Sequence, residues 1–155
     1  MLCMKPRTTF NRNFIKYWLP VVFWMCFILW MSTETFSSRN TSALVETILP
    51  LLIPEISSQE LALIHVFMRK LGHFIEYFIL GILFFRAFRG GSTASCSWRW
   101  YFFAVTLIVL WAASDEFHQS FVPTRTASIV DVGIDTAGGI LAQFVNGWWH
   151  RCRKK

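Results

Sequence analysis

The chain has 155 residues, of which 54% are hydrophobic, 17% are aromatic and only 15% are charged. Ordinary globular proteins carry about 25% charged residues, and a soluble core of this size has too little interior for 16 Phe and 8 Trp. The net charge of +6 does not indicate a nucleic-acid partner, because the basic residues flank apolar runs and no nucleic-acid-binding motif is present. We therefore expect residues 1–155 to form one all-α membrane domain.

Four apolar stretches are each long enough to cross about 30 Å of hydrocarbon as helices. They cover residues 14–31, 61–88, 98–113 and 127–149. The first resembles a signal peptide because a basic segment precedes it, but its length and the lack of an A-x-A site favour an uncleaved span. The stretch LVETILPLLI, residues 44–53, is too short for a fifth span, so we expect an interfacial or re-entrant segment there.

Charged residues divide between the two ends of these helices. Most of the 15 basic residues lie before the first span, between the second and third, or after the fourth: Lys5, Arg7, Arg12, Lys16, Arg86, Arg89, Arg99, Arg151, Arg153, Lys154 and Lys155. Short cytoplasmic loops retain Lys and Arg, so we expect a multi-pass cell-membrane protein with both termini in the cytoplasm. All 9 acidic residues fall on the other side, in the outer loops or near the outer helix ends.

The second span opens with RKLGHFIEYFILG and carries a polar stripe. At 100° per residue, Lys70, His73, Tyr77 and Gly81 share one face, and Glu76 lies at its edge. For Arg69, beside this stripe, we expect an interfacial role in which the side chain reaches into the headgroups.

Two further polar stripes flank the turn FVPTR. In WAASDEFHQSF, at the end of the third span, Asp115 shares a face with His118 and Gln119, and Glu116 shares a face with Gln119. In the last helix one face carries Ser128, Asp131, Asp135, Gly138 and Ala142. Small residues let a neighbouring backbone come close, so this face is expected to be buried against other helices.

All three stripes belong to outer helix ends, so we expect them to meet in one outward-facing cluster. Polar groups that face lipid cost a few kcal/mol each, and they therefore turn inward and pair. The candidate partners are Asp131 or Glu116 for Arg125, and Asp115, Glu76 or Asp135 for Lys70. Acids still outnumber bases in the cluster, which calls for a bound cation, a protonated His73 or His118, or a carboxylic acid that stays neutral.

The same residues resemble the VanZ-like family of bacterial integral membrane proteins. The family pattern combines Lys-x-x-His-x-x-x-Tyr with Asp-Glu-x-x-Gln-x-Phe-x-Pro-x-Arg and a later Asp, Asp or Asn, and Gly. The matching positions are Lys70, His73, Tyr77, Asp115, Glu116, Gln119, Phe121, Pro123, Arg125, Asp131, Asp135 and Gly138. Thr124 stands where the family usually has Gly. The resemblance implies a cell-envelope role, linked in the founding member to resistance against teicoplanin, and supplies no established reaction.

We consider three functions for such a cluster. An enzyme acting on a lipid-linked or headgroup substrate would use Asp115 or Glu116 as general base, oriented by His73 or His118. The substrate-binding candidates are Lys70, Tyr77, His118, Gln119, Arg125, Asp131 and Asp135. A non-catalytic binder or small permease would use the same groups for a headgroup, a proton or a cation. A non-catalytic structural partner would instead alter how envelope precursors or glycopeptides reach the surface.

A metal centre is the less favoured reading of these side chains. Candidate ligands are present in His73, His118, Asp115, Glu116 and Asp131, but no HExxH-type spacing joins them. The four cysteines form no CxxC pair. We expect no cofactor, and we expect membrane lipids and a lipid-linked or cell-wall precursor as partners.

The expected orientation can be tested by cysteine labelling in a chain whose own cysteines are replaced by serine. Ser37→Cys and Ser120→Cys should react with a membrane-impermeant maleimide in intact cells, whereas Ser95→Cys should react only after permeabilisation. Labelling of Ser95→Cys from outside intact cells would reverse the orientation.

Overall fold

The computed structural model describes residues 8–33, 56–90, 97–122 and 127–152. These residues form four helices and no strand: α1 (Thr8–Met31), α3 (Ser58–Arg89), α4 (Trp98–Gln119) and α5 (Ile129–Cys152). The predicted all-α fold is confirmed. The predicted interfacial segment at 44–53 and the turn residue Arg125 lie outside the described residues.

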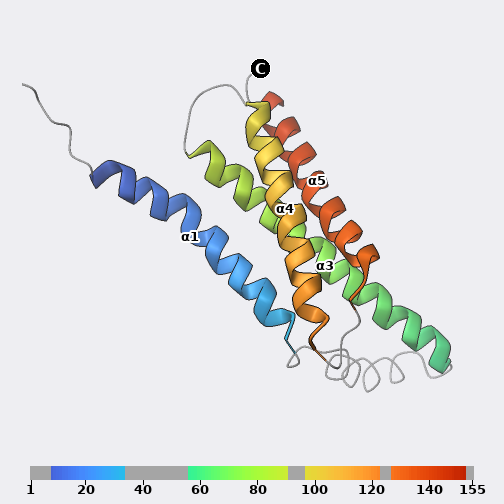
Figure 1. The fold of residues 1–155 in the computed structure, drawn as a ribbon. Helices are drawn as coiled ribbons and strands as arrows, with labels where there is room; N and C mark the ends of the chain where they lie inside the picture. Colours follow the sequence, from blue (N-terminus) through green and yellow to red (C-terminus); the bar gives the residue numbers. More distant parts are fainter. Residues whose placement is uncertain (1–7, 34–55, 91–96, 123–126, 153–155) are drawn as a thin grey trace, which may run out of the picture.

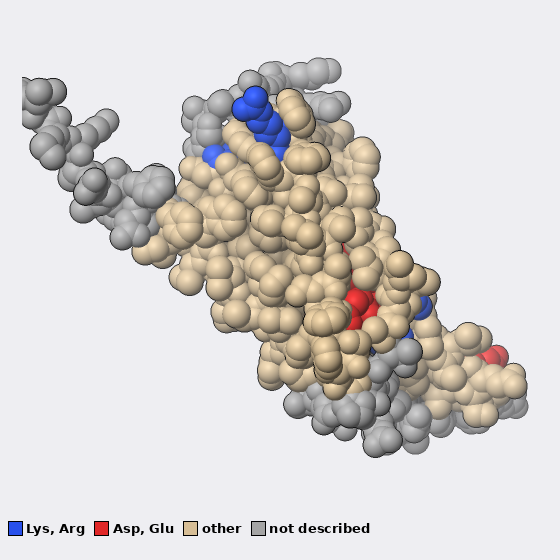
Figure 2. Space-filling model, viewed as in Figure 1, with Lys and Arg blue, Asp and Glu red and all other residues tan. Residues whose placement is uncertain are grey.

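Three helices are long and apolar enough to cross a membrane: Phe14–Met31, Ser58–Arg89 and Trp98–Gln119. The surface of the bundle fits this reading, since exposed side chains include Phe23, Leu63, Phe102 and Phe144. The face in Figure 2 is mostly uncharged, with basic groups near its upper end and acidic groups, with a few basic atoms beside them, lower down. The fourth helix, α5, is 24 residues long and is not among these three; its buried side chains include Asp131, Asp135 and Gln143. Its role as a span stays a prediction.

Local sequence signals set the ends of α3. At its N-terminus, Ser57 and Glu60 form a reciprocal capping box, in which the Ser57 side chain accepts from the Glu60 N–H and the Glu60 carboxylate accepts from the Ser57 N–H. At its C-terminus, Gly90 has φ 55° and donates its N–H to Arg86 O, which is the conformation that glycine adopts most readily. Helix α4 continues past the predicted residue 113 to Gln119, so the acidic stretch after Ala113 is helical.

The helices run alternately up and down (Figure 1). The first turn of α1 and the last turn of α5 therefore lie toward the same end of the bundle. Helix α5 packs along α3 and also against α4, while α1 contacts α3 and leans away from the bundle at its N-terminal end. Trp24 of α1 donates its indole N–H to Glu76 O of α3 at 2.9 Å, which attaches the two helices near the polar end of the bundle.

Glycines allow α5 to approach both neighbours closely. A Cβ added at Gly138 would collide with the carbonyl oxygen of Phe74 in α3, and one at Gly139 would lie 2.6 Å from the Ile108 side chain in α4. A third close contact joins Gly81 of α3 to Ala142 of α5. Backbones packed this closely leave no room for longer side chains, as the small-residue face of the last helix predicted.

The contact at Gly138 predicts a large effect for a small substitution. Gly138→Ala should lower the free energy of unfolding by about 1–3 kcal/mol, because the obstacle is a backbone atom that cannot rotate away. Thermal unfolding of the purified protein in detergent measures the loss.

Gly133 is the matched control in the same helix, since an added Cβ there meets nothing within 4 Å. Gly133→Ala should be neutral or stabilising by at most about 1 kcal/mol, because Ala favours the helix. Equal stability of the two variants would show that Gly138 does not set the distance between α3 and α5.

Candidate functional site

The polar stripe of α3 lies on the face that meets α5. Tyr77 is fully buried and His73 is 9% exposed, while Lys70, one turn nearer the helix start, keeps 32% of its side chain exposed. The helical repeat places all three on one side, as the sequence predicted. Burial thus deepens from Lys70 toward Tyr77.

The end of α4 supplies a second set of buried groups. Asp115, Glu116 and Gln119 are each at most 5% exposed. Gln119 donates its amide N–H to Asp115 Oδ2 at 3.1 Å, and Glu116 Oε2 accepts the backbone N–H of Ser128 at 2.7 Å. The second bond ties the end of α4 to the residue just before α5, so it fixes where α5 begins.

The first turns of α5 bring Asp131 and Asp135 to α3. Lys70 Nζ lies 2.8 Å from Asp131 Oδ1, and Arg69 Nη2 lies 3.7 Å from Asp131 Oδ2. The partners predicted for Lys70 did not include Asp131, and that prediction was wrong. Asp131 lies one turn nearer the N-terminus of α5 than Asp135, and it is the carboxylate that Lys70 reaches. Arg69, predicted as a headgroup anchor, also reaches Asp131.

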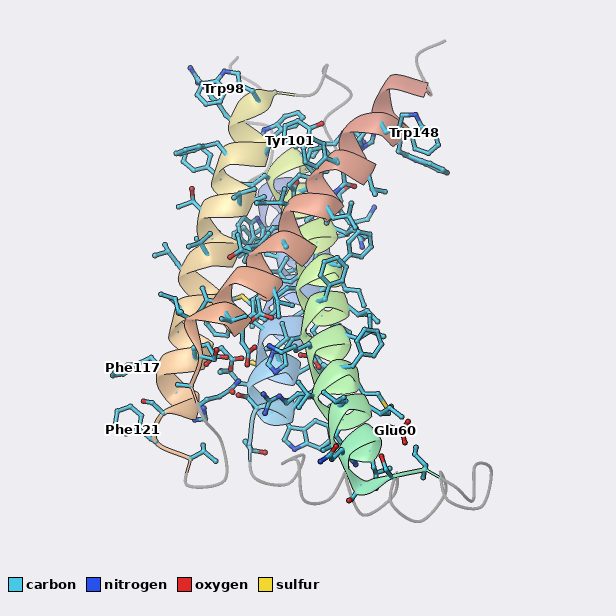
Figure 3. The ribbon with its side chains drawn as sticks, turned by 90° about the vertical axis from the view of Figure 1, so that its right-hand side faces the viewer. Glu60, Trp98, Tyr101, Phe117, Phe121 and Trp148 are labelled. Atoms are coloured by element: carbon cyan, nitrogen blue, oxygen red, sulfur yellow. The ribbon has the colours of Figure 1, made fainter. Side chains whose placement is uncertain are left out.

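Deeper in the bundle, a histidine and two carboxylates from three helices converge. His73 Nδ1 lies 3.4 Å from Asp135 Oδ1. One ligand atom each of His73, Asp115 and Asp135 lies within 4.8 Å of the others, and all three residues are buried. Figure 3 shows oxygen and nitrogen atoms gathered between the helices in this half of the bundle.

Several buried polar atoms of this cluster make no hydrogen bond within the described residues. They include Tyr77 Oη, Asp135 Oδ2 and Glu116 Oε1. Tyr77 lies one helical turn beyond His73 on the same buried face of α3. Buried groups of this kind are costly unless something satisfies them, which makes the cluster a candidate binding site.

Most of the sequence-predicted site residues are therefore close together. The cluster contains Lys70, His73, Tyr77, Asp115, Glu116, Gln119, Asp131 and Asp135. His118 is exposed on α4 and is not part of it, and Arg125 lies outside the described residues. In Figure 3 Phe117 and Phe121, on either side of His118 in the chain, point away from the bundle.

Sequence reasoning missed Gln143, a buried polar residue of α5. Its amide donates to Gly81 O on α3 at 3.0 Å and lies 3.4 Å from Gly139 O. Gln143 follows the small residues of α5, and a polar residue beside such a face was the available signal for a helix-to-helix hydrogen bond.

The fold and the cluster define a helical membrane protein with a group of polar side chains buried between its helices. The family model of VanZ/LLP1 matches residues 17–149, and the chain belongs to this family. The matched region covers nearly the whole chain, including every described residue of the cluster. Comparisons with curated proteins and with solved structures found no match.

The pair of Lys70 and Asp131 can be tested by a double-mutant cycle. Lys70→Met should destabilise the protein by about 1–3 kcal/mol, because it leaves a buried carboxylate without its charge-assisted bond. Asp131→Asn in the same chain should recover part of the loss. Thermal unfolding in detergent measures each variant.

Arg69→Met is the matched control, since Arg69 contacts the same carboxylate at the longer distance of 3.7 Å and from a more exposed position. It should cost clearly less than Lys70→Met. Additive effects of Lys70→Met and Asp131→Asn would rule out a direct interaction.

Proposed function

We propose that this VanZ/LLP1 protein binds the polar headgroup of a lipid-linked or cell-wall precursor at the outer half of the bacterial cell membrane. The observation that carries the proposal is the convergence of buried acids, His73 and Tyr77 from three helices in a chain with few charges. Intramembrane ionisable groups are expensive, and they mark ligand or ion pathways by default.

The charge distribution supports an outward-facing site. The acids of the cluster lie toward the end of α4 and the start of α5, whereas Arg86 and Arg89 lie in the last turn of α3, at the opposite end of the bundle. With the basic end in the cytoplasm, the acidic end faces the outer leaflet.

The rim of the site provides groups for an anionic or hydroxyl-rich headgroup. Lys70 and Arg69 keep about a third of their side chains exposed while they contact Asp131. Both can therefore reach a ligand and still remain beside their acid. Through the family resemblance, we connect such binding to resistance against teicoplanin.

Catalysis at this site is the second candidate function. His73 and Asp135 are 3.4 Å apart, and Asp115 lies within reach of both. A histidine beside one carboxylate and close to a second is an arrangement that general acid–base catalysis uses. Asp115 is our candidate base for hydrolysis or transfer at the headgroup.

Expression in a teicoplanin-susceptible bacterium tests the proposal. The wild-type chain should raise the minimum inhibitory concentration of teicoplanin. His73→Ala and Asp115→Asn should abolish the rise, because the first removes a buried imidazole and the second replaces a buried carboxylate by a neutral amide. Immunoblots of the membrane fraction establish equal protein levels.

Glu60→Gln is the control, because Glu60 is an exposed acid of the same helix and glutamine can preserve the capping box. It should keep full resistance. An Asp115→Asn variant that still binds precursor but gives no resistance would indicate catalysis, and loss of both would indicate binding. Resistance that survives both cluster substitutions would refute the site.

A further inference from the structure

His73, Asp115 and Asp135 come from three different helices and meet at one buried point. His73 lies in the middle of α3, Asp115 in the last turns of α4 and Asp135 in the second turn of α5. Their nearest ligand atoms lie within 4.8 Å of one another. Because no two of them share a helix, no spacing rule in the sequence could reveal the group.

The distances suit a small cation. Nitrogen and oxygen ligands bind a divalent transition metal at about 2.0–2.2 Å, so two ligands in a tetrahedral site are about 3.4 Å apart. His73 Nδ1 and Asp135 Oδ1 already have a separation of 3.4 Å. The third ligand, which lies within 4.8 Å of the other two, must move inward by up to about 1.4 Å to reach this separation.

The charges also suit a divalent ion. Two ionised aspartates and a neutral imidazole carry two negative charges, which one divalent cation neutralises. This matters because an unpaired charge in the low-dielectric interior of the bundle has a high free-energy cost. The Lys70 and Arg69 side chains are both directed to Asp131, at the rim.

A second observation points to a ligand at the same place. Tyr77 and Asp135 are completely buried, and Tyr77 Oη and Asp135 Oδ2 have no hydrogen-bond partner in the described chain. Asp135 is itself a member of the group, and Tyr77 lies one helical turn beyond His73 on the same buried face of α3. An ion with a bound water or headgroup oxygen would give the phenol an acceptor and the carboxylate a partner.

We propose that His73, Asp115 and Asp135 bind a first-row divalent transition metal ion. An imidazole ligand favours such metals over Mg²⁺ and Ca²⁺, which prefer sites made of oxygen alone. Three protein ligands leave a coordination position open, as in catalytic zinc sites, so an oxygen of a bound headgroup can coordinate the ion. This metal site extends the proposed function and rests on it, because the headgroup and the ion would bind to the same cluster.

Metal binding to the full-length protein in detergent tests the assignment. Protein stripped with EDTA and dialysed against Zn²⁺ or Mn²⁺ should retain one ion per chain by elemental analysis, and excess Mg²⁺ should not displace it. Asp135→Asn and His73→Gln should weaken metal binding by more than about 100-fold. Loss of a side chain that only hydrogen-bonds a metal ligand already weakens binding by about 10- to 100-fold, and loss of the ligand itself should weaken it more. Addition of Zn²⁺ should also raise the melting temperature of the stripped wild-type protein.

Glu60→Gln again serves as control, because it removes one carboxylate outside the cluster and should keep full binding. Failure of the wild-type chain to retain an ion would overturn the proposal whether or not any variant folds. Full binding by folded Asp135→Asn would overturn it as well. Metal binding without a teicoplanin phenotype would support the metal site and refute the envelope role. Resistance without metal binding would support the envelope role and refute the metal site.

Discussion

The contact between Gly138 and the backbone of α3 at Phe74 determines how the polar groups meet. His73 precedes Phe74 in the chain, and Asp135 lies one turn before Gly138, so the closest approach of the two helices falls beside this pair. A larger residue at Gly138 would separate the backbones and carry Asp135 away from His73. The 3.4 Å separation of their side chains thus depends on a residue that has no side chain of its own.

The cluster has two levels with different chemistry. At the rim, Asp131 meets Lys70, and Glu116 holds the N–H of Ser128, so charges and donors are matched. Farther in, a fully buried tyrosine and aspartate retain polar atoms that no described group satisfies. In a low-dielectric interior such atoms are costly, and they persist where a ligand supplies the missing partner. The rim contacts therefore join the helices, and the inner level is the part of the cluster for which we propose a ligand.

The opposite half of the bundle gives this site a rigid support. Leu80, Phe84, Ala104 and Ile108 form a buried apolar core beyond Tyr77. Near the far end, Phe85 packs its ring against Trp100, Tyr101 and His150 from α4 and α5. Close packing in this half limits rotation of the helices, and small rotations would otherwise separate groups that are only a few ångströms apart.

The sequence by itself determined the helices, the apolar surface and the face on which each polar residue lies, because hydrophobic periodicity and capping are local properties. It also predicted that α3, α4 and α5 would bring their polar stripes together. Only the tertiary structure decided that Lys70 meets Asp131 rather than Asp135, that His118 stays outside the cluster, and that His73, Asp115 and Asp135 share one point. These outcomes depend on the rotation and spacing of neighbouring helices, which backbone contacts at Gly138 and Gly139 set and no local pattern encodes.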